Sequence, residues 1–491
     1  MALKGKGMAE KKSLKLNFIM NAMLTMSSFL FPLISFPYVS RILGPEGTGR
    51  VDFATSLIAY FLMFAQLGIP TYGVRACAKV RDDKHLLTKT AQELLIINLV
   101  MSVVAYAALA VGLIFVPILR EDRMLYVVVS LTIIFNTIGM EWLYKALEQY
   151  TYITVRSIAF KLVSLVAMFA LIRAKDDYLI YGGITILASS ASYLMNFVHA
   201  RKYISLRPVG GYSFKPHLRA VMVFFAMACA TTVYTNMDKV MLGLFLGPDS
   251  VYGGYYGAAT RIKSILVSIV TSLGTVLLPR ASYYVQNGQM DEFRKISRKA
   301  LNFVVLAAAP LTLYFILFAR QGILLLSGAA YLGAVAPMQL IMPTLLFIGL
   351  TNILGIQILV PTGREKTVLY SVIVGAVTDV ICNFLLIPRF QAAGAALSNM
   401  IAEAAVLVFQ IVALRKEIGT AFRSISYWKV ILGLVAAVAA SVWVISLGLG
   451  SFLALAVSAC LFFGAYALVL LLTKEPLVGE VLGQVLRKIR K

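Results

Sequence analysis

Long apolar stretches alternate along the chain with short segments rich in polar and charged residues. Each stretch is close to the roughly 20 residues that a helix needs to cross a bilayer. The pattern predicts fourteen membrane-spanning helices, over 16–40, 51–70, 92–117, 124–144, 153–172, 178–198, 220–246, 252–279, 300–319, 332–360, 367–387, 392–414, 430–447 and 451–473. An even number of spans places both ends of the chain on the same side of the membrane.

The composition supports a polytopic membrane protein built entirely of α-helices. Of the 491 residues, 60% are hydrophobic and 14% are charged, whereas soluble domains are about half apolar and a quarter charged. This balance excludes a cytosolic enzyme, a disulfide scaffold and a disordered protein. The four cysteines, Cys77, Cys229, Cys382 and Cys460, show no spacing typical of a metal site, and we interpret them as inert.

Positive charge is distributed unevenly between the two sides of the predicted topology. Of the 45 Lys and Arg residues, 33 fall in the two tails and the even-numbered loops, and 8 in the odd-numbered loops. Cytoplasmic loops carry such an excess, so we expect both termini in the cytoplasm and the protein in the cytoplasmic (inner or plasma) membrane of a bacterium. Topology thus explains most of the net charge of +23, and nucleic acid is not expected as a partner.

Three segments of the first half recur in the second half. LGPEGTGRVDFATS resembles LGPDSVYGGYYGAATR, NTIGMEWL resembles NILGIQIL, and LIRAKDDYLIYGGITILAS resembles LIPRFQAAGAALSN. The matches relate spans 1–2 to 7–8, span 4 to 10 and span 6 to 12, which indicates two parallel six-helix lobes. Parallel repeats rock about a central site in transporters.

The repeat sets the expected domain organisation. We predict an N-terminal lobe of helices 1–6 (1–200), a basic cytoplasmic linker (201–219), a C-terminal lobe of helices 7–12 (220–415), helices 13–14 (416–475) and an amphipathic cytoplasmic tail (476–491).

Five basic residues lie within or at the edges of the predicted spans: Arg50, Lys161, Lys239, Arg261 and Lys263. Charge at membrane depth costs about 2.5–3.5 kcal/mol per group, so such residues face a cavity or a partner. A cavity with Lys and Arg donors suits phosphate groups, and we interpret the five as substrate-binding. Structural alternatives remain: Lys161 can snorkel to the cytoplasmic face, and the others can form salt bridges that only hold helices together.

Acidic and amide residues in the spans are fewer. Asp379 and Asn383 are four residues apart, so they share a helix face and could bind a small hard cation or simply join helices. Asp238 precedes Lys239 in the seventh predicted span, and Glu403 is a candidate counter-charge. Glu141 is expected to pair with Lys145, one turn along the same helix.

Several sequence segments together resemble a known family. Polysaccharide-repeat-unit (Wzx-type) flippases contain segments similar to SRILGPEGTGRVDFATS, GMEWLYKALEQYTYITVRSIAFKLVSL, NMDKVMLGLFLGPDSVYGGYYGAATRI, SLGTVLLPRAS and LLIPRFQAAGAALSN. These belong to the multidrug/oligosaccharidyl-lipid/polysaccharide exporter (MOP) superfamily. The resemblance implies fourteen helices in two six-helix lobes plus two further helices, around a V-shaped cationic cavity.

The resemblance also implies an activity. The protein is expected to move an undecaprenyl-diphosphate-linked oligosaccharide from the cytoplasmic to the outer leaflet by alternating access, beside the polymerase and glycosyltransferases of the same pathway. By similarity to lipid II flippases, Asp238, Asp379 and Asn383 would bind a coupling cation, Na⁺ or H⁺. No other cofactor and no catalytic residue is expected.

Two other functions remain as alternatives. A multidrug antiporter of the same superfamily would expel organic cations, which favour an acidic, aromatic cavity, whereas the charges in these spans are mainly basic. A membrane glycosyltransferase or polymerase would carry its catalytic groups on loops outside the membrane, and the predicted outward loops are short.

Overall fold

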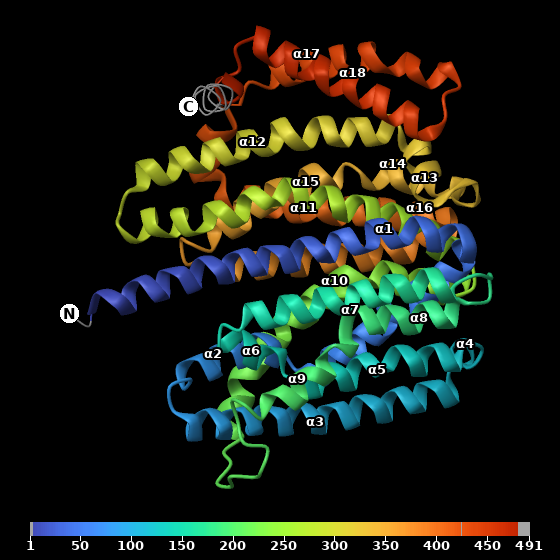
Figure 1. Ribbon diagram of the computed structural model, residues 1–491. Helices are drawn as coiled ribbons and strands as arrows, with labels where there is room; N and C mark the ends of the chain where they lie inside the picture. The colour runs from blue at the N-terminus through green and yellow to red at the C-terminus, as the bar shows by residue number, and fades with distance from the viewer. Residues whose placement is uncertain (1–2, 424, 480–491) are drawn as a thin grey trace. The chain divides into compact units, whose positions relative to one another are not determined.

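The computed structural model describes residues 3–423 and 425–479, and every regular element in those ranges is a helix (Figure 1). The chain forms two compact units, Met1–Gly253 (unit 1) and Gly254–Lys491 (unit 2). The predicted division into lobes at 201–219 stays a prediction, because compactness alone does not define which helices move together.

Unit 1 contains eleven helices, of which one is a π-helix (η1). They are α1 (Leu3–Gln66), α2 (Ile69–Lys79), α3 (Lys84–Phe115), α4 (Pro117–Arg120), α5 (Arg123–Gly139), α6 (Glu141–Ala146), α7 (Tyr150–Leu171), α8 (Tyr178–Ile186), η1 (Leu187–Ala191), α9 (Tyr193–Ala200) and α10 (Lys215–Leu246).

Unit 2 takes up the rest of the chain, starting near the beginning of α11. Its helices are α11 (Val251–Gln286), α12 (Met290–Leu317), α13 (Ala319–Ser327), η2 (Ala329–Ala334), α14 (Val335–Ile341), α15 (Thr344–Thr351), η3 (Asn352–Leu359), α16 (Glu365–Arg423), α17 (Tyr427–Ser441), η4 (Val442–Leu447) and α18 (Ser451–Leu472). Of these, η3 is a π-helix, and η2 and η4 are 3₁₀-helices.

Among the described residues, nine helices are long and apolar enough to cross a membrane. A tenth span is added if the pair Ala329–Ile341 and Thr344–Leu359, bent by 44°, counts as one crossing. The expectation of an all-helical, multi-pass membrane protein is therefore confirmed. The number fourteen and the cytoplasmic position of the termini stay predictions.

At two places where the sequence predicts a loop, the structure has a helix that is interrupted at a single residue. The expected connection at 41–50 lies inside α1, which departs from helical geometry at Gly44 (φ 68°), directly before Pro45. The expected connection at 388–391 lies inside α16, which breaks at Gln391 (φ 49°) just after Pro388. Proline lacks the N–H that a continuing helix needs, so both breaks occur where the hydrogen-bond ladder is already interrupted.

Three further segments of the expected organisation can be compared with the structure. The expected outward loop near 320–331 is largely helical, because α13 and η2 occupy most of it. Most of the predicted amphipathic tail, 480–491, lies outside the described residues. The linker, up to the start of α10, is irregular and is held against α3.

Two adjacent polar residues of α3 hold this linker. The Gln92 side chain donates to the carbonyls of Ser205 and Arg207, both at 2.8 Å, and accepts from the Val209 backbone N–H at 3.2 Å. Glu93 accepts from the Ser213 backbone N–H at 2.7 Å. The segment predicted to be a linker is therefore held as a fixed part of unit 1.

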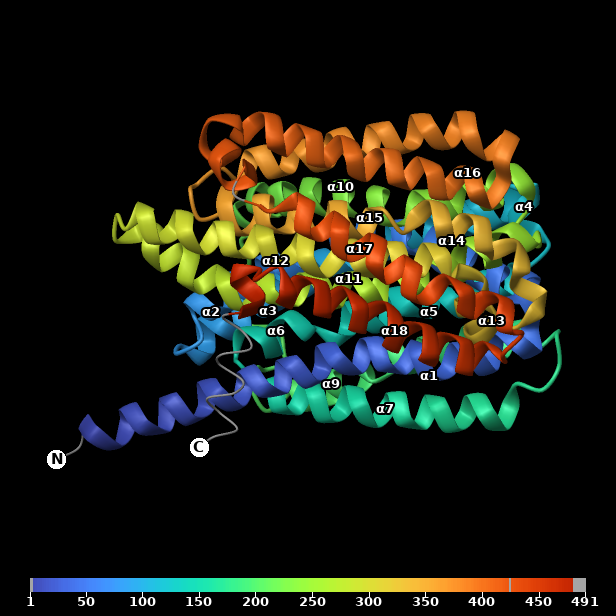
Figure 2. The same cartoon turned by 90° about the horizontal axis from the view of Figure 1, so that it is seen from above.

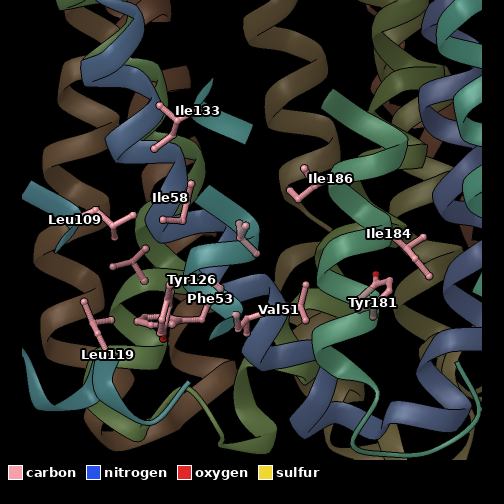
Figure 3. Close-up of a cluster of buried hydrophobic side chains, with 14 of the residues drawn as sticks. Val51, Phe53, Ile58, Leu109, Leu119, Tyr126, Ile133, Tyr181, Ile184 and Ile186 are labelled. Atoms are coloured by element: carbon pink, nitrogen blue, oxygen red, sulfur yellow. The ribbon is translucent and has the colours of Figure 1, made fainter. Parts of the chain in front are cut away.

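One hydrophobic cluster of unit 1 forms where α1, α3, α5 and α8 turn apolar faces toward one another (Figure 3). Phe53 and Tyr126 pack edge to face, with ring centroids 6.3 Å apart. Gly243 of α10 lies directly against the Phe53 ring, where a larger side chain would not fit. Lipid is as apolar as these side chains, so close packing rather than escape from water holds the helices together.

In unit 2, α17 and α18 lie side by side (Figures 1 and 2), and tyrosines join α12 to α18. The Tyr314 hydroxyl donates to the Leu455 carbonyl at 2.9 Å, and the Tyr466 hydroxyl donates to the Leu306 carbonyl at 3.2 Å. Tyr314 thus donates from α12 to α18 and Tyr466 from α18 to α12, and each hydroxyl finds a partner in an apolar setting.

Substitution of Gly394 tests the close approach of the two arms of α16. A methyl group there would meet the Leu386 carbonyl carbon at 2.6 Å and the Ile387 nitrogen at 2.9 Å, and backbone atoms cannot rotate away. Gly394→Ala is expected to destabilise the protein by about 1–3 kcal/mol, measured as a lower unfolding temperature in detergent.

The matched control is Gly464→Ala in α18, where nothing lies within 4 Å of the added methyl group. This change is expected to be neutral or slightly stabilising, since alanine favours helix. Equal effects of the two substitutions would contradict the close approach.

Candidate functional site

Arg50 lies in α1, beyond the break at Gly44, and binds a buried carboxylate. Its Nη1 is 3.0 Å from Asp122 Oδ2, and the Tyr178 hydroxyl donates to the other oxygen of Asp122 at 2.8 Å. The guanidinium also lies 5.2 Å from the centre of the Tyr178 ring. The Asp122 side chain is 7% exposed, so this carboxylate is held by its partners rather than by water.

Lys239 of α10 faces α1. Its Nζ lies 3.9 Å from Asp52 Oδ2, a long ion pair between two helices of unit 1. Asp52 is buried, and so is the neighbouring Asp238. This is the geometry of the structural alternative, in which Lys239 joins helices.

Lys161 and Lys263 each bind neutral oxygen atoms. Lys161 of α7 donates to the hydroxyls of Ser27 and Ser28 on α1, both at 2.9 Å. Lys263 of α11 donates to the Asn399 side-chain oxygen on the second arm of α16 at 2.9 Å. Hydroxyl and amide oxygens satisfy the ammonium without neutralising its charge.

The basic residues therefore fall into two groups. Arg50 and Lys239 lie beside carboxylates, whereas Lys161 and Lys263 donate hydrogen bonds to uncharged oxygen atoms. Arg261 lies on α11 close in sequence to Lys263.

Asp379 and Asn383 lie on one face of α16, and both are fully buried. Asp238 belongs to unit 1, so an ion site that combines it with these two residues stays a prediction. Among the described residues, no three His, Cys, Asp or Glu side chains gather as a metal site.

The predicted pair of Glu141 and Lys145 is confirmed, at 2.8 Å. Glu141 also lies 3.4 Å from Arg156, which the sequence analysis did not single out because it counts among the basic residues flanking a span. The Arg156 side chain is 3% exposed and contacts the buried Asn196. An isolated Asn in an apolar span was the signal available in the sequence.

Two protein-family models match this chain. The family model for polysaccharide biosynthesis proteins matches residues 14–285, more than half of the chain. The chain belongs to this family. A second model, MatE, matches residues 224–385. The resemblance to Wzx-type flippases of the MOP superfamily is thereby confirmed.

Relatives of this family member match over most of their length. A protein of Escherichia coli (strain K12) with the provisional name O-antigen transporter is 25% identical over 83% of this chain and 98% of its own. A protein of Shigella dysenteriae with the same provisional name is 22% identical over 82% of this chain and 100% of its own.

Solved structures show the fold of this family member. The lipid II flippase MurJ, in an inward closed conformation, has a TM-score of 0.72 and 14% identity, covering 92% of this chain and 98% of its own. A multidrug resistance MATE family transporter of the MOP superfamily, inward-facing, has a TM-score of 0.56 and 13% identity, covering 83% of this chain and 99% of its own. The fold is thus shared by transporters of different cargo.

Substitution of Arg50 tests its role in holding Asp122. Arg50→Ala leaves a buried carboxylate without its charged partner, and we expect a loss of about 1–3 kcal/mol, because the arginine itself is partly exposed. Denaturant unfolding in detergent measures the loss.

Arg294→Ala is the control, since its ion pair with Asp291 is at 3.8 Å between side chains 62% and 99% exposed. This change is expected to alter stability by less than about 0.5 kcal/mol. A comparable loss in both variants would argue against a buried Arg50–Asp122 pair.

Proposed function

We propose that this protein is a flippase that moves an undecaprenyl-diphosphate-linked oligosaccharide from the cytoplasmic to the outer leaflet by alternating access. The observation that carries the proposal is that Lys161 in unit 1 and Lys263 in unit 2 each donate hydrogen bonds to uncharged oxygens among apolar helices, in a chain of the polysaccharide family. Such cations suit a diphosphate. The O-antigen relatives and the MurJ-like fold support the same cargo class.

The proposed topology has fourteen spans with both termini in the cytoplasm of a bacterium. Dividing α1 at Gly44 and α16 at Gln391 gives two spans each, and the 17-residue α5 and the long α11 each add one. With the bent pair counted as one crossing, this division gives fourteen. The lobes would be 1–200 and 220–415, joined by the linker, with helices 13 and 14 outside the repeat.

In the proposed mechanism, basic residues draw in the diphosphate while the lipid tail stays in the bilayer. Arg50, Lys161, Lys239, Arg261 and Lys263 would line the path of the head group. Because Arg50 and Lys239 already lie beside Asp122 and Asp52, the substrate must compete with these carboxylates. No chemical step is needed, so the protein would act as a transporter beside the enzymes of the pathway.

Transport in proteoliposomes tests the proposal. Wild-type protein is expected to move a labelled undecaprenyl-diphosphate oligosaccharide, while Lys161→Ala and Lys263→Ala are expected to slow transport at least about tenfold, the effect of losing about 1.4 kcal/mol of binding. The control is Lys295→Ala, because Lys295 is 66% exposed and pairs with Glu292 on the same helix.

Two outcomes would contradict the flippase proposal. Full transport by both Lys161→Ala and Lys263→Ala would exclude these lysines as the site of the diphosphate. Absence of lipid transport by the wild type, together with expulsion of an organic cation, would favour the multidrug antiporter. The MatE match over residues 224–385 is the specific observation behind that second candidate.

Ion coupling is a separate part of the proposal. We propose that Asp238, Asp379 and Asn383 bind the coupling cation, Na⁺ or H⁺, and that its binding biases the return step. Asp379→Asn is expected to abolish the stimulation of transport by an imposed ion gradient while leaving gradient-free transport measurable. Stimulation equal to that of the wild type would exclude Asp379 from coupling.

A further inference from the structure

The repeated segments NTIGMEWL and NILGIQIL both depart from regular α-helix. In unit 1, α5 ends at Gly139, Met140 is left-handed (φ 40°, ψ 43°), and α6 begins at Glu141. In unit 2, the second copy is the π-helix η3 (352–359). π-Helices are rare and are frequently found at functional sites. Regular α-helix is therefore interrupted at the same position of both repeats, and we call each interruption, at Met140 and at η3, a joint.

Side chains from two neighbouring helices clamp the joint of unit 1. Asn196 of α9 donates through Nδ2 to the Gly139 carbonyl at 2.8 Å, and its Oδ1 accepts from Arg156 of α7. Arg156 in turn lies 3.4 Å from Glu141. The residues directly before and after Met140 are thus fixed to α9 and α7 by one connected network.

Aromatic residues enclose the clamp. The Tyr144 hydroxyl donates to the Asn196 carbonyl at 2.6 Å. The Arg156 guanidinium lies 5.7 Å from the centre of the Tyr152 ring and 5.1 Å from that of Tyr193. The Arg156 side chain is 3% exposed and Asn196 is fully buried, while the Glu141 side chain is 21% exposed. The arginine end of the pair therefore lies in a medium of low dielectric constant, where a charge is hard to separate from its partner.

Unit 2 brings together three of the corresponding residues: Gly355, Ser371 and Gln410. A methyl group on Gly355 would lie 3.2 Å from Gln410 Nε2, and the same Nε2 donates to Ser371 Oγ at 3.0 Å. The corresponding pairs, each separated by 214–216 residues, are Gly139 and Gly355, Glu141 and Gln357, Arg156 and Ser371, and Asn196 and Gln410. The last two pairs lie outside the short matching segments NTIGMEWL and NILGIQIL, so the contacts extend the repeat beyond the sequence similarity.

The two clamps differ in charge. Gln357 stands in place of Glu141 and Ser371 in place of Arg156, so unit 2 has no ion pair at this position among the corresponding residues. Gln357 Nε2 and Gln410 Oε1 are buried without a hydrogen-bond partner. Neutral contacts with spare donors and acceptors are easier to exchange than a buried charge pair.

We propose that the joint of unit 1 is locked by the Glu141–Arg156–Asn196 clamp, and that η3 of unit 2 is the joint that bends during transport. The proposal rests on the alternating-access function proposed above. Bending would shift the register of η3 between π and α geometry, which requires only local exchange of hydrogen bonds.

Hydrogen–deuterium exchange of the full chain in lipid nanodiscs tests the asymmetry without any transport assay. Amides of 352–360 are expected to exchange at least tenfold faster than those of 139–146. Equal protection of the two segments, or faster exchange in unit 1, would overturn the proposal.

Exchanging the two sets of side chains tests the cause. Glu141→Gln with Arg156→Ser is expected to raise exchange of 139–146 at least tenfold, and Gln357→Glu with Ser371→Arg is expected to slow exchange of 352–360. The control is Glu148→Gln with Arg81→Ser, an ion pair at 2.8 Å whose side chains are 46% and 45% exposed, which should change neither segment. If neutralising the clamp leaves 139–146 protected, charge is not what locks it.

Transport measured on the same variants separates the two proposals. Gln357→Glu with Ser371→Arg is expected to stop lipid movement in protein that remains folded. Failure of the wild type to move lipid would contradict the flippase function, whereas normal transport with a slowed 352–360 segment would contradict the bending joint alone.

Discussion

A polar group placed among apolar helices must find a partner within the protein, and this requirement orders much of the structure. Lipid offers neither hydrogen bonds nor counter-ions. Arg50 accordingly binds Asp122, Lys263 binds Asn399, and Arg156 lies between Glu141 and Asn196. Each contact joins different helices, so the need to satisfy a charge also fixes how the helices pack.

The same requirement links stability to function. A charge whose partner is another charge is expensive to separate, while a charge held by hydroxyl or amide oxygens can exchange them for a ligand at smaller cost. Lys161 and Lys263 belong to the second kind. In the flippase proposal, the type of partner therefore separates residues that mainly hold the fold from residues that would bind the anionic head group.

Much of the fold could be predicted from the sequence, because apolar stretches and the distribution of Lys and Arg follow directly from the bilayer. The breaks were harder to predict. Gly44 and Gln391 interrupt helices at single residues, which a search for polar loops interprets as longer connections. Pairing was harder still: Asp122 and Arg50 are far apart in the chain, and no local pattern indicates that Arg156 reaches Asn196. The one pair that was predicted, Glu141 with Lys145, is separated by a single helical turn.

The linker after α9 illustrates how a basic loop can be structured without regular secondary structure. Gln92 and Glu93 bind its backbone at four points, and Gly210 and Gly211 turn it through left-handed conformations (φ 72° and 62°). Its arginines and lysines therefore project from a fixed backbone. Any molecule that recognises this loop meets a folded epitope, in which the spacing of the charges is set by the helix beneath it.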